Sequence, residues 1–125
     1  LKFESAQIRI IVEPNDEQIL TEMLRADLAI ATGGHTMYEL AAVGTPVIQI
    51  QVAKNQEVSK YWELFGFSQF IGWHDDPEFW DKLTLAISHF ESKDVRQKSS
   101  NEAQFVIDGY GSLRLIKEVV GYNVG

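Results

Sequence analysis

The sequence has no cysteine, no linker rich in proline, glycine or serine, and no apolar run near the ~20 residues that a membrane helix needs. Without cysteine the chain has no disulfide and no thiolate metal site, which is compatible with a cytoplasmic protein. The net charge of −7 disfavours nucleic acid as a partner, because a duplex binder needs a basic face. We expect one cytoplasmic domain spanning residues 1–125, without a transmembrane segment.

Apolar residues make up 45% of the chain, as in ordinary globular domains, and strand-like and helix-like segments alternate. Runs of β-branched and other apolar residues predict strands at residues 8–12, 27–31, 47–52 and 67–71. Caps and apolar periodicity predict helices after Asn15, with Gln18 as its capping partner, from Pro77, and at 36–43, 55–65, 95–106 and 112–120. Gly44 is expected to end the helix at 36–43. The pattern predicts a Rossmann-like α/β fold of three layers, a parallel sheet with helices on both faces.

The turn Thr32-Gly33-Gly34-His35 is the most informative feature. It joins a predicted strand to a predicted helix, and therefore lies at the edge of the sheet where parallel α/β proteins bind ligands. Two glycines let the backbone approach a ligand closely, and the helix offers free N–H groups and the positive end of its dipole. A diphosphate suits this place. A Gly-Gly turn is also common as a merely tight turn, so both interpretations stay open.

Glu39 has two interpretations of equal weight. With Thr36 it fits a capping box, in which the Glu39 carboxylate bonds back to the Thr36 N–H. Alternatively, its carboxylate accepts both hydroxyls of a ribose, as acidic residues do in dinucleotide-binding folds. One carboxylate cannot serve both roles fully.

Lys54-Asn55-Gln56 follows the strand at 47–52 and belongs to the same edge of the sheet. Asn55 fits a helix cap with an exposed Gln56, or both amides hydrogen-bond a sugar or diphosphate. His35 is either a plain polar residue, a phosphate donor or an acid/base. The remaining histidines lack metal-ligand spacing, and we expect no metal site.

Tryptophans and a pair of carboxylates complete the candidates. The tryptophans are Trp62, Trp73 and Trp80. They suggest a stacking platform, but the helical spacing of Trp80 favours the core, and Trp73 has no explanation from the sequence. Asp75 and Asp76 resemble catalytic carboxylates, although helix capping before Pro77 accounts for them better.

The chain also resembles a known family. The resemblance rests on residues 26–46, ADLAIATGGHTMYELAAVGTP, with support from residues 54–56 and 108–114. These runs are similar to the C-terminal domain of GT-B nucleotide-sugar enzymes of the glycosyltransferase family 28 type. Within that group the likeness is greatest to the UDP-sugar hydrolase of pseudaminic acid biosynthesis and to spore-coat polysaccharide biosynthesis proteins. It covers residues 8–120, and the central run is its most specific part.

The resemblance implies a GT-B fold of two Rossmann-like domains, of which this chain is a truncated half. The positions that match the nucleotide-sugar site are Gly33, Gly34, His35, Thr36, Glu39, Asn55 and Gln56. The first four match the loop that meets the diphosphate, Glu39 matches the ribose-binding residue, and the two amides match a segment near the sugar. The family's catalytic His belongs to the N-terminal domain, so His35 does not inherit that role. No cofactor is expected.

We therefore expect the UDP-sugar-binding half of a hydrolase or glycosyltransferase in cell-surface polysaccharide or nonulosonic acid biosynthesis. Its partners are then a UDP-sugar or similar nucleotide-sugar and the N-terminal domain of the same protein, and the fragment alone is expected to be inactive. The alternative is a non-catalytic nucleotide-sugar-binding or scaffold module, fused to a sugar-activating enzyme such as an acylneuraminate cytidylyltransferase.

The sequence begins without methionine and without a signal pattern, so we expect a piece of a longer protein. The family's C-terminal domain opens with further strands and a glycine-rich loop, which this chain is expected to lack. A sheet edge without those strands is open to pairing with another chain, which predicts self-association.

Overall fold

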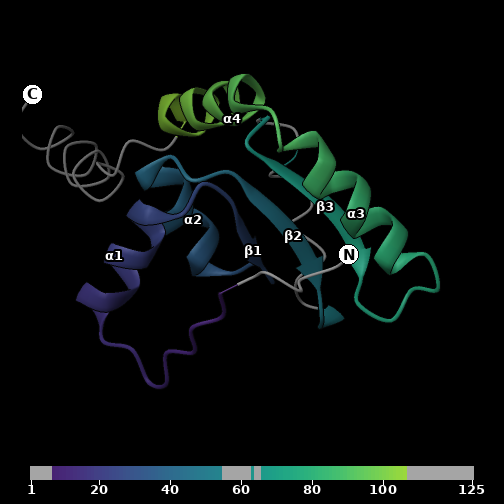
Figure 1. Cartoon of the computed structure of the whole chain (residues 1–125), viewed down its shortest axis with the longest axis horizontal. Coiled ribbons are helices and arrows are strands. Elements are labelled where there is room, and N and C mark those ends of the chain that lie inside the picture. The colour runs from purple at the N-terminus through teal and green to yellow at the C-terminus, as the bar shows by residue number, and fades with distance from the viewer. Residues whose placement is uncertain (1–6, 55–62, 64–65, 107–125) are drawn as a thin grey trace, which may run out of the picture.

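The structure is a computed structural model that describes residues 7–54, 63 and 66–106. Three parallel strands form one sheet in the order β1-β2-β3. The strands are β1 (Ala29–Ala31), β2 (Val47–Gln51) and β3 (Ser68–Trp73). The helices in the described chain are α1 (Asp16–Arg25), α2 (His35–Val43), α3 (Phe79–His89) and α4 (Lys93–Val106). Figure 1 shows α1 and α2 beside β1, and α3 beside β3.

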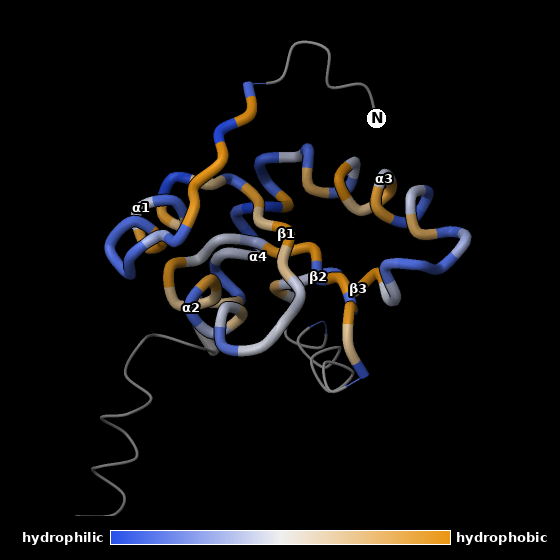
Figure 2. The backbone as a smooth tube through the Cα atoms, turned by 90° about the horizontal axis from the view of Figure 1, so that it is seen from below, coloured by the Kyte–Doolittle hydropathy of each residue, from blue (hydrophilic) through white to orange (hydrophobic). Residues whose placement is uncertain are grey.

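Helices cover both faces of the sheet, and each face has its own core (Figure 2). On the α2 face, Met37 of α2 and Ala103 of α4 pack against Val47 of β2. On the α3 face, Leu83 of α3 packs against Ile48 of the same strand. Val47 and Ile48 are neighbours that point to opposite faces, which is why β2 is apolar almost throughout. The predicted α/β architecture with helices on both faces of a parallel sheet is confirmed.

Two local capping signals, the Asn15 capping box and the Gly44 cap, were predicted correctly. Asn15 and Gln18 form the reciprocal capping box, with backbone-to-side-chain distances of 2.9 and 2.8 Å between them. Gly44 ends α2 in the left-handed conformation, with φ of 78°. These features depend on residues a few positions apart, so the sequence determines them without help from distant contacts.

The predicted strand at residues 8–12 is wrong. This segment has no regular secondary structure, and Ile8, Ile10 and Val12 are 79–82% exposed (Figure 2). Arg9 forms an ion pair with Glu22 of α1 instead. A strand needs a neighbour for its hydrogen bonds, and no strand of the described sheet pairs with this segment.

Several element boundaries differ from the prediction by one or two residues. The strand expected at 67–71 runs from Ser68 to Trp73, and α3 begins at Phe79 rather than at Pro77. Trp80, expected in the core, is 67% exposed, because α3 turns Phe79 and Leu83 toward the sheet. Apart from residue 63, the helices predicted at 55–65 and 112–120 lie outside the described residues.

Within the described residues, no helix is both long enough and apolar enough to cross a membrane. β1 and β3 are the edge strands of the described sheet, and Ile30 of β1 is 51% exposed. The predicted self-association of the chain remains a prediction.

Candidate functional site

The carboxyl edge of the sheet, where β1, β2 and β3 end, carries the candidate site. After Ala31, Thr32 leads into Gly33 with φ of 105° and Gly34 with φ of 76° and ψ of −154°. The Gly34 backbone lies in a region that essentially only glycine adopts. A Cβ atom at Gly34 meets no atom within 4 Å. The turn therefore needs glycine for its backbone conformation and not because neighbours crowd it.

The N-terminus of α2 is suited to an anion. Gly34 is its N-cap residue and makes no side-chain capping bond. The first turn of α2 contains no acidic residue, whereas α1, α3 and α4 each have one or two in theirs. His35 and Thr36 open the helix, and the first N–H groups of an α-helix have no partner inside it. Both side chains are exposed.

The capping interpretation of Glu39 is wrong. The helix starts at His35, one residue before Thr36, and no side chain caps it, so Glu39 is not the reciprocal partner of a cap at Thr36. Glu39 is exposed, and with Asp16 and Met23 of α1 it lines a hollow of about 310 Å³. Its carboxylate thus lies on the side of α2 that faces α1. The ribose role stays a prediction.

At the end of β2, Gln51 is buried, and its side-chain amide donates to the Ala53 carbonyl at 3.3 Å. Lys54 follows and is exposed. Asn55 and Gln56, the next two predicted site residues, lie outside the described residues. The register shows that β2 and β3 end at the same level, because Gln51 pairs with Trp73. β1 ends two residues earlier, with Ala31 opposite Gln49.

β3 reaches this edge through a bulge. Gln49 pairs with Phe70 and Ile50 with Gly72, so Ile71 is an extra residue without a counterpart on β2. Gly72 has φ of 86°. Because side chains alternate between faces, the extra residue moves Trp73 from the α3 face to the α2 face. The strand predicted at 67–71 ended before Gly72, so the bulge was not predicted; a glycine within a strand pattern is the sequence signal that could have indicated it.

Asp76 has a structural role. One carboxylate oxygen accepts from the Glu78 backbone N–H at 2.7 Å, and the other accepts from the Lys82 ammonium at 3.1 Å. These two contacts hold the pKa of Asp76 below its ordinary value. The predicted helix cap at Asp76 is wrong, because the N-cap residue of α3 is Glu78 and no side chain caps that helix; Asp76 instead holds the turn before α3. Asp75 is exposed.

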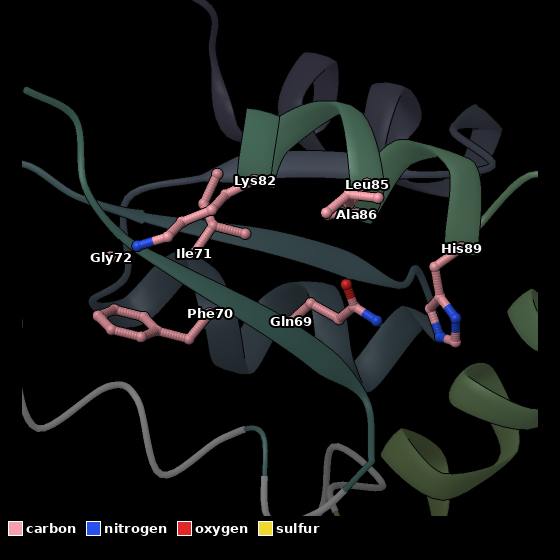
Figure 3. Close-up of a pocket in the computed structure, with 8 residues that line it drawn as sticks. All are labelled: Gln69, Phe70, Ile71, Gly72, Lys82, Leu85, Ala86 and His89. Carbon is pink, nitrogen blue, oxygen red and sulfur yellow. The ribbon is translucent and has the colours of Figure 1, made fainter. Parts of the chain in front are cut away.

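No group of three or more metal-binding side chains occurs in the described part of the chain. His74 lies beside Trp73, with ring centroids 6.3 Å apart, and His89 lies against Phe90 at 5.0 Å. A hollow of about 520 Å³ lies between β3 and α3, lined by Gln69, Lys82 and His89 among others (Figure 3). It is on the α3 face and is separate from the Gly33-Gly34 turn.

Gln49 is a residue that the sequence interpretation missed. It is fully buried, and neither its amide nitrogen nor its amide oxygen has a hydrogen-bond partner in the described structure. The buried Ser68 hydroxyl also has no hydrogen-bond partner in the described structure. Both lie on the α2 face, because Ser68 pairs with Val47, two residues before Gln49. A polar residue in the middle of an apolar strand was the signal available in the sequence.

Comparisons with protein-family models, with curated proteins and with solved structures found no match to this chain. The likeness of residues 26–46 to the GT-B nucleotide-sugar enzymes therefore remains a resemblance, and the function it implies is a proposal.

Proposed function

We propose that this chain is the nucleotide-sugar-binding half of a UDP-sugar hydrolase or glycosyltransferase that acts in the cytoplasm on precursors of cell-surface polysaccharides or nonulosonic acids. In this proposal the diphosphate binds at Gly33, Gly34, His35 and Thr36. Catalytic groups come from an N-terminal domain of the same protein, which the family resemblance implies.

One observation carries the proposal. The Gly34 backbone conformation aims an uncapped helix N-terminus, free of acidic residues in its first turn, at the carboxyl edge of a parallel sheet. Such an N-terminus binds phosphate through backbone N–H groups and its dipole, without needing Lys or Arg. A chain with a net charge of −7 can therefore hold a diphosphate at this one place.

Glu39 is assigned to the ribose. Its carboxylate is exposed, makes no capping bond at the helix start, and lies five residues after Gly34. A ribose bound there is continuous with a diphosphate at the turn. The amides of Asn55 and Gln56 complete the proposed site on the strength of the resemblance alone.

The test is titration of wild type and Glu39→Gln with UDP by calorimetry, with backbone NMR shifts to locate the ligand. Loss of charge-assisted hydrogen bonds worth about 1.5–3 kcal/mol weakens binding roughly tenfold to hundredfold. Folding stability should change by less than about 0.5 kcal/mol, because Glu39 is exposed. Shifts are expected at the amides of residues 33–36.

Glu91→Gln is the matched control, because it removes the same charge from an exposed position beyond the far end of α3. It should bind UDP like wild type. No binding of UDP, UDP-N-acetylhexosamine or CMP by wild type refutes the proposed function. If Glu39→Gln binds UDP as tightly as wild type, Glu39 is not part of the binding site. The diphosphate assignment to the glycine turn then still stands.

A further inference from the structure

We infer that the Trp73 indole is a platform for the sugar ring of the nucleotide-sugar. This inference rests on the proposed function and extends it to the sugar, to which the proposed function assigns no residue of the described structure. Trp73 is the last residue of β3 and is 37% exposed. Its exposed ring lies at the carboxyl edge, where the diphosphate is proposed to bind.

The bulge in β3 is the first reason. Without the extra residue Ile71, Trp73 would point to the α3 face, away from the Gly33-Gly34 turn and α2. With it, Trp73 shares the α2 face with Gln51. Bulges occur often beside binding sites, where they redirect a side chain at the expense of regular pairing. Gly72, with φ of 86°, supplies the backbone conformation that the bulge requires.

Position along the edge is the second reason. At standard sheet spacings, the two strand steps from β1 to β3 place Trp73 roughly 10 Å across the sheet from Ala31. Trp73 also lies two residues farther along the strand direction, which adds about 7 Å. The separation is then about 12 Å between backbone positions, which a diphosphate and an attached hexose can span. Glu39 lies on the opposite side of the turn, facing α1. Ribose, diphosphate and sugar therefore follow one another from α1 toward β3.

The chemistry of the ring is the third reason. A pyranose presents a face of C–H groups, which packs on an indole, while its hydroxyl groups stay available to polar partners. His74 is exposed and its ring is 6.3 Å from that of Trp73, so a polar group borders the platform. Trp80 is more exposed, at 67%, but lies on α3 and makes an edge contact with Phe79.

The experiment compares the affinities of UDP and UDP-N-acetylglucosamine in wild type, Trp73→Ala, Trp73→Phe and the matched control Trp80→Ala. In wild type the sugar should add affinity over UDP alone. Trp73→Ala should lose that gain, on the order of tenfold or about 1.4 kcal/mol, while UDP affinity stays unchanged. Trp73→Phe should retain most of the gain, and Trp80→Ala should retain all of it.

If Trp73→Ala does not fold, as judged by circular dichroism, Trp73→Leu keeps an apolar side chain without an aromatic face and takes its place. A full sugar gain in the folded variant overturns the inference and leaves the proposed function standing. An equal loss of UDP and UDP-N-acetylglucosamine affinity overturns it too, because Trp73 then serves the nucleotide. Wild type that binds both ligands equally refutes the platform, and wild type that binds neither refutes the proposed function with it.

Discussion

Replacing Gln49 by Met should stabilise the protein. The Gln49 side chain is fully buried in the central strand, and its amide has no hydrogen-bond partner among the described residues. Ala31 and Phe70, its neighbours in register on β1 and β3, offer only apolar side chains. Met has a similar length and an unbranched, adaptable side chain, so it fits the same space without a buried polar group.

The magnitude follows from the unsatisfied amide. A buried polar group without a partner costs about 1–3 kcal/mol, and an apolar group of the same shape removes that cost. Allowing for imperfect packing of Met, we expect a gain of about 1–2 kcal/mol in the free energy of unfolding. For a domain of this size, each kcal/mol corresponds to a rise in Tm of about 3–6 °C.

The assay is urea unfolding followed by circular dichroism, with Gln51→Met as the matched control. Gln51 lies two residues farther along β2 on the same face and is nearly as buried, but its amide donates to the Ala53 carbonyl. The same substitution there removes a hydrogen bond and should cost about 0.5–1.5 kcal/mol. A Gln49→Met variant less stable than wild type would refute the reasoning, because the amide must then have a partner.

Three further predictions concern two glycines and one carboxylate. Gly34→Ala should cost about 1–3 kcal/mol through backbone strain alone, since its Cβ meets no atom within 4 Å. Gly44→Ala also places its Cβ 2.5 Å from the Ser100 hydroxyl oxygen. In urea melts, adding Ser100→Ala should therefore recover part of the stability that Gly44→Ala loses. Adding Ser100→Ala to Gly34→Ala should recover none. Because the folded pKa of Asp76 is lowered, its carboxylate stabilises the fold above its unfolded pKa, near pH 4, and this contribution is lost as the pH falls through the folded value. Asp76→Asn should therefore be less stable than wild type at pH 7, and the two should converge in acid; a difference that persists in acid means that the carboxylate charge is not the cause.

Much of the fold was predictable because its signals are local. The capping box of Asn15 and Gln18, the Gly33-Gly34 turn and the Gly44 cap each involve residues within a few positions. Strand and helix types follow from apolar patterns with periods of two and 3.6. The positions of β1, α2 and β2 were therefore anticipated to within about two residues.

What could not be predicted depends on partners far away in the sequence. Residues 8–12 have the composition of a strand, but a strand also needs a neighbour, and composition does not supply one. Trp80 has core spacing on α3, yet the helix turns a different stripe to the sheet. The register shift in β3 decides which face Trp73 occupies, and the strand predicted at 67–71 ended before Gly72, the residue that marks the bulge.

The proposed anion site makes stability and binding respond in opposite directions to one change. The first turn of α2 has no acidic residue, although an acid there would interact favourably with the helix dipole. Thr36→Asp supplies that acid and should stabilise the fold by about 0.3–1 kcal/mol. The same carboxylate repels a diphosphate, so UDP affinity should fall in calorimetry. If α2 has only a structural role, Thr36→Asp still gains stability, but wild type does not bind UDP. A variant that is more stable and still binds UDP as wild type does places the diphosphate away from this helix, because one N-terminus cannot serve two anions at once.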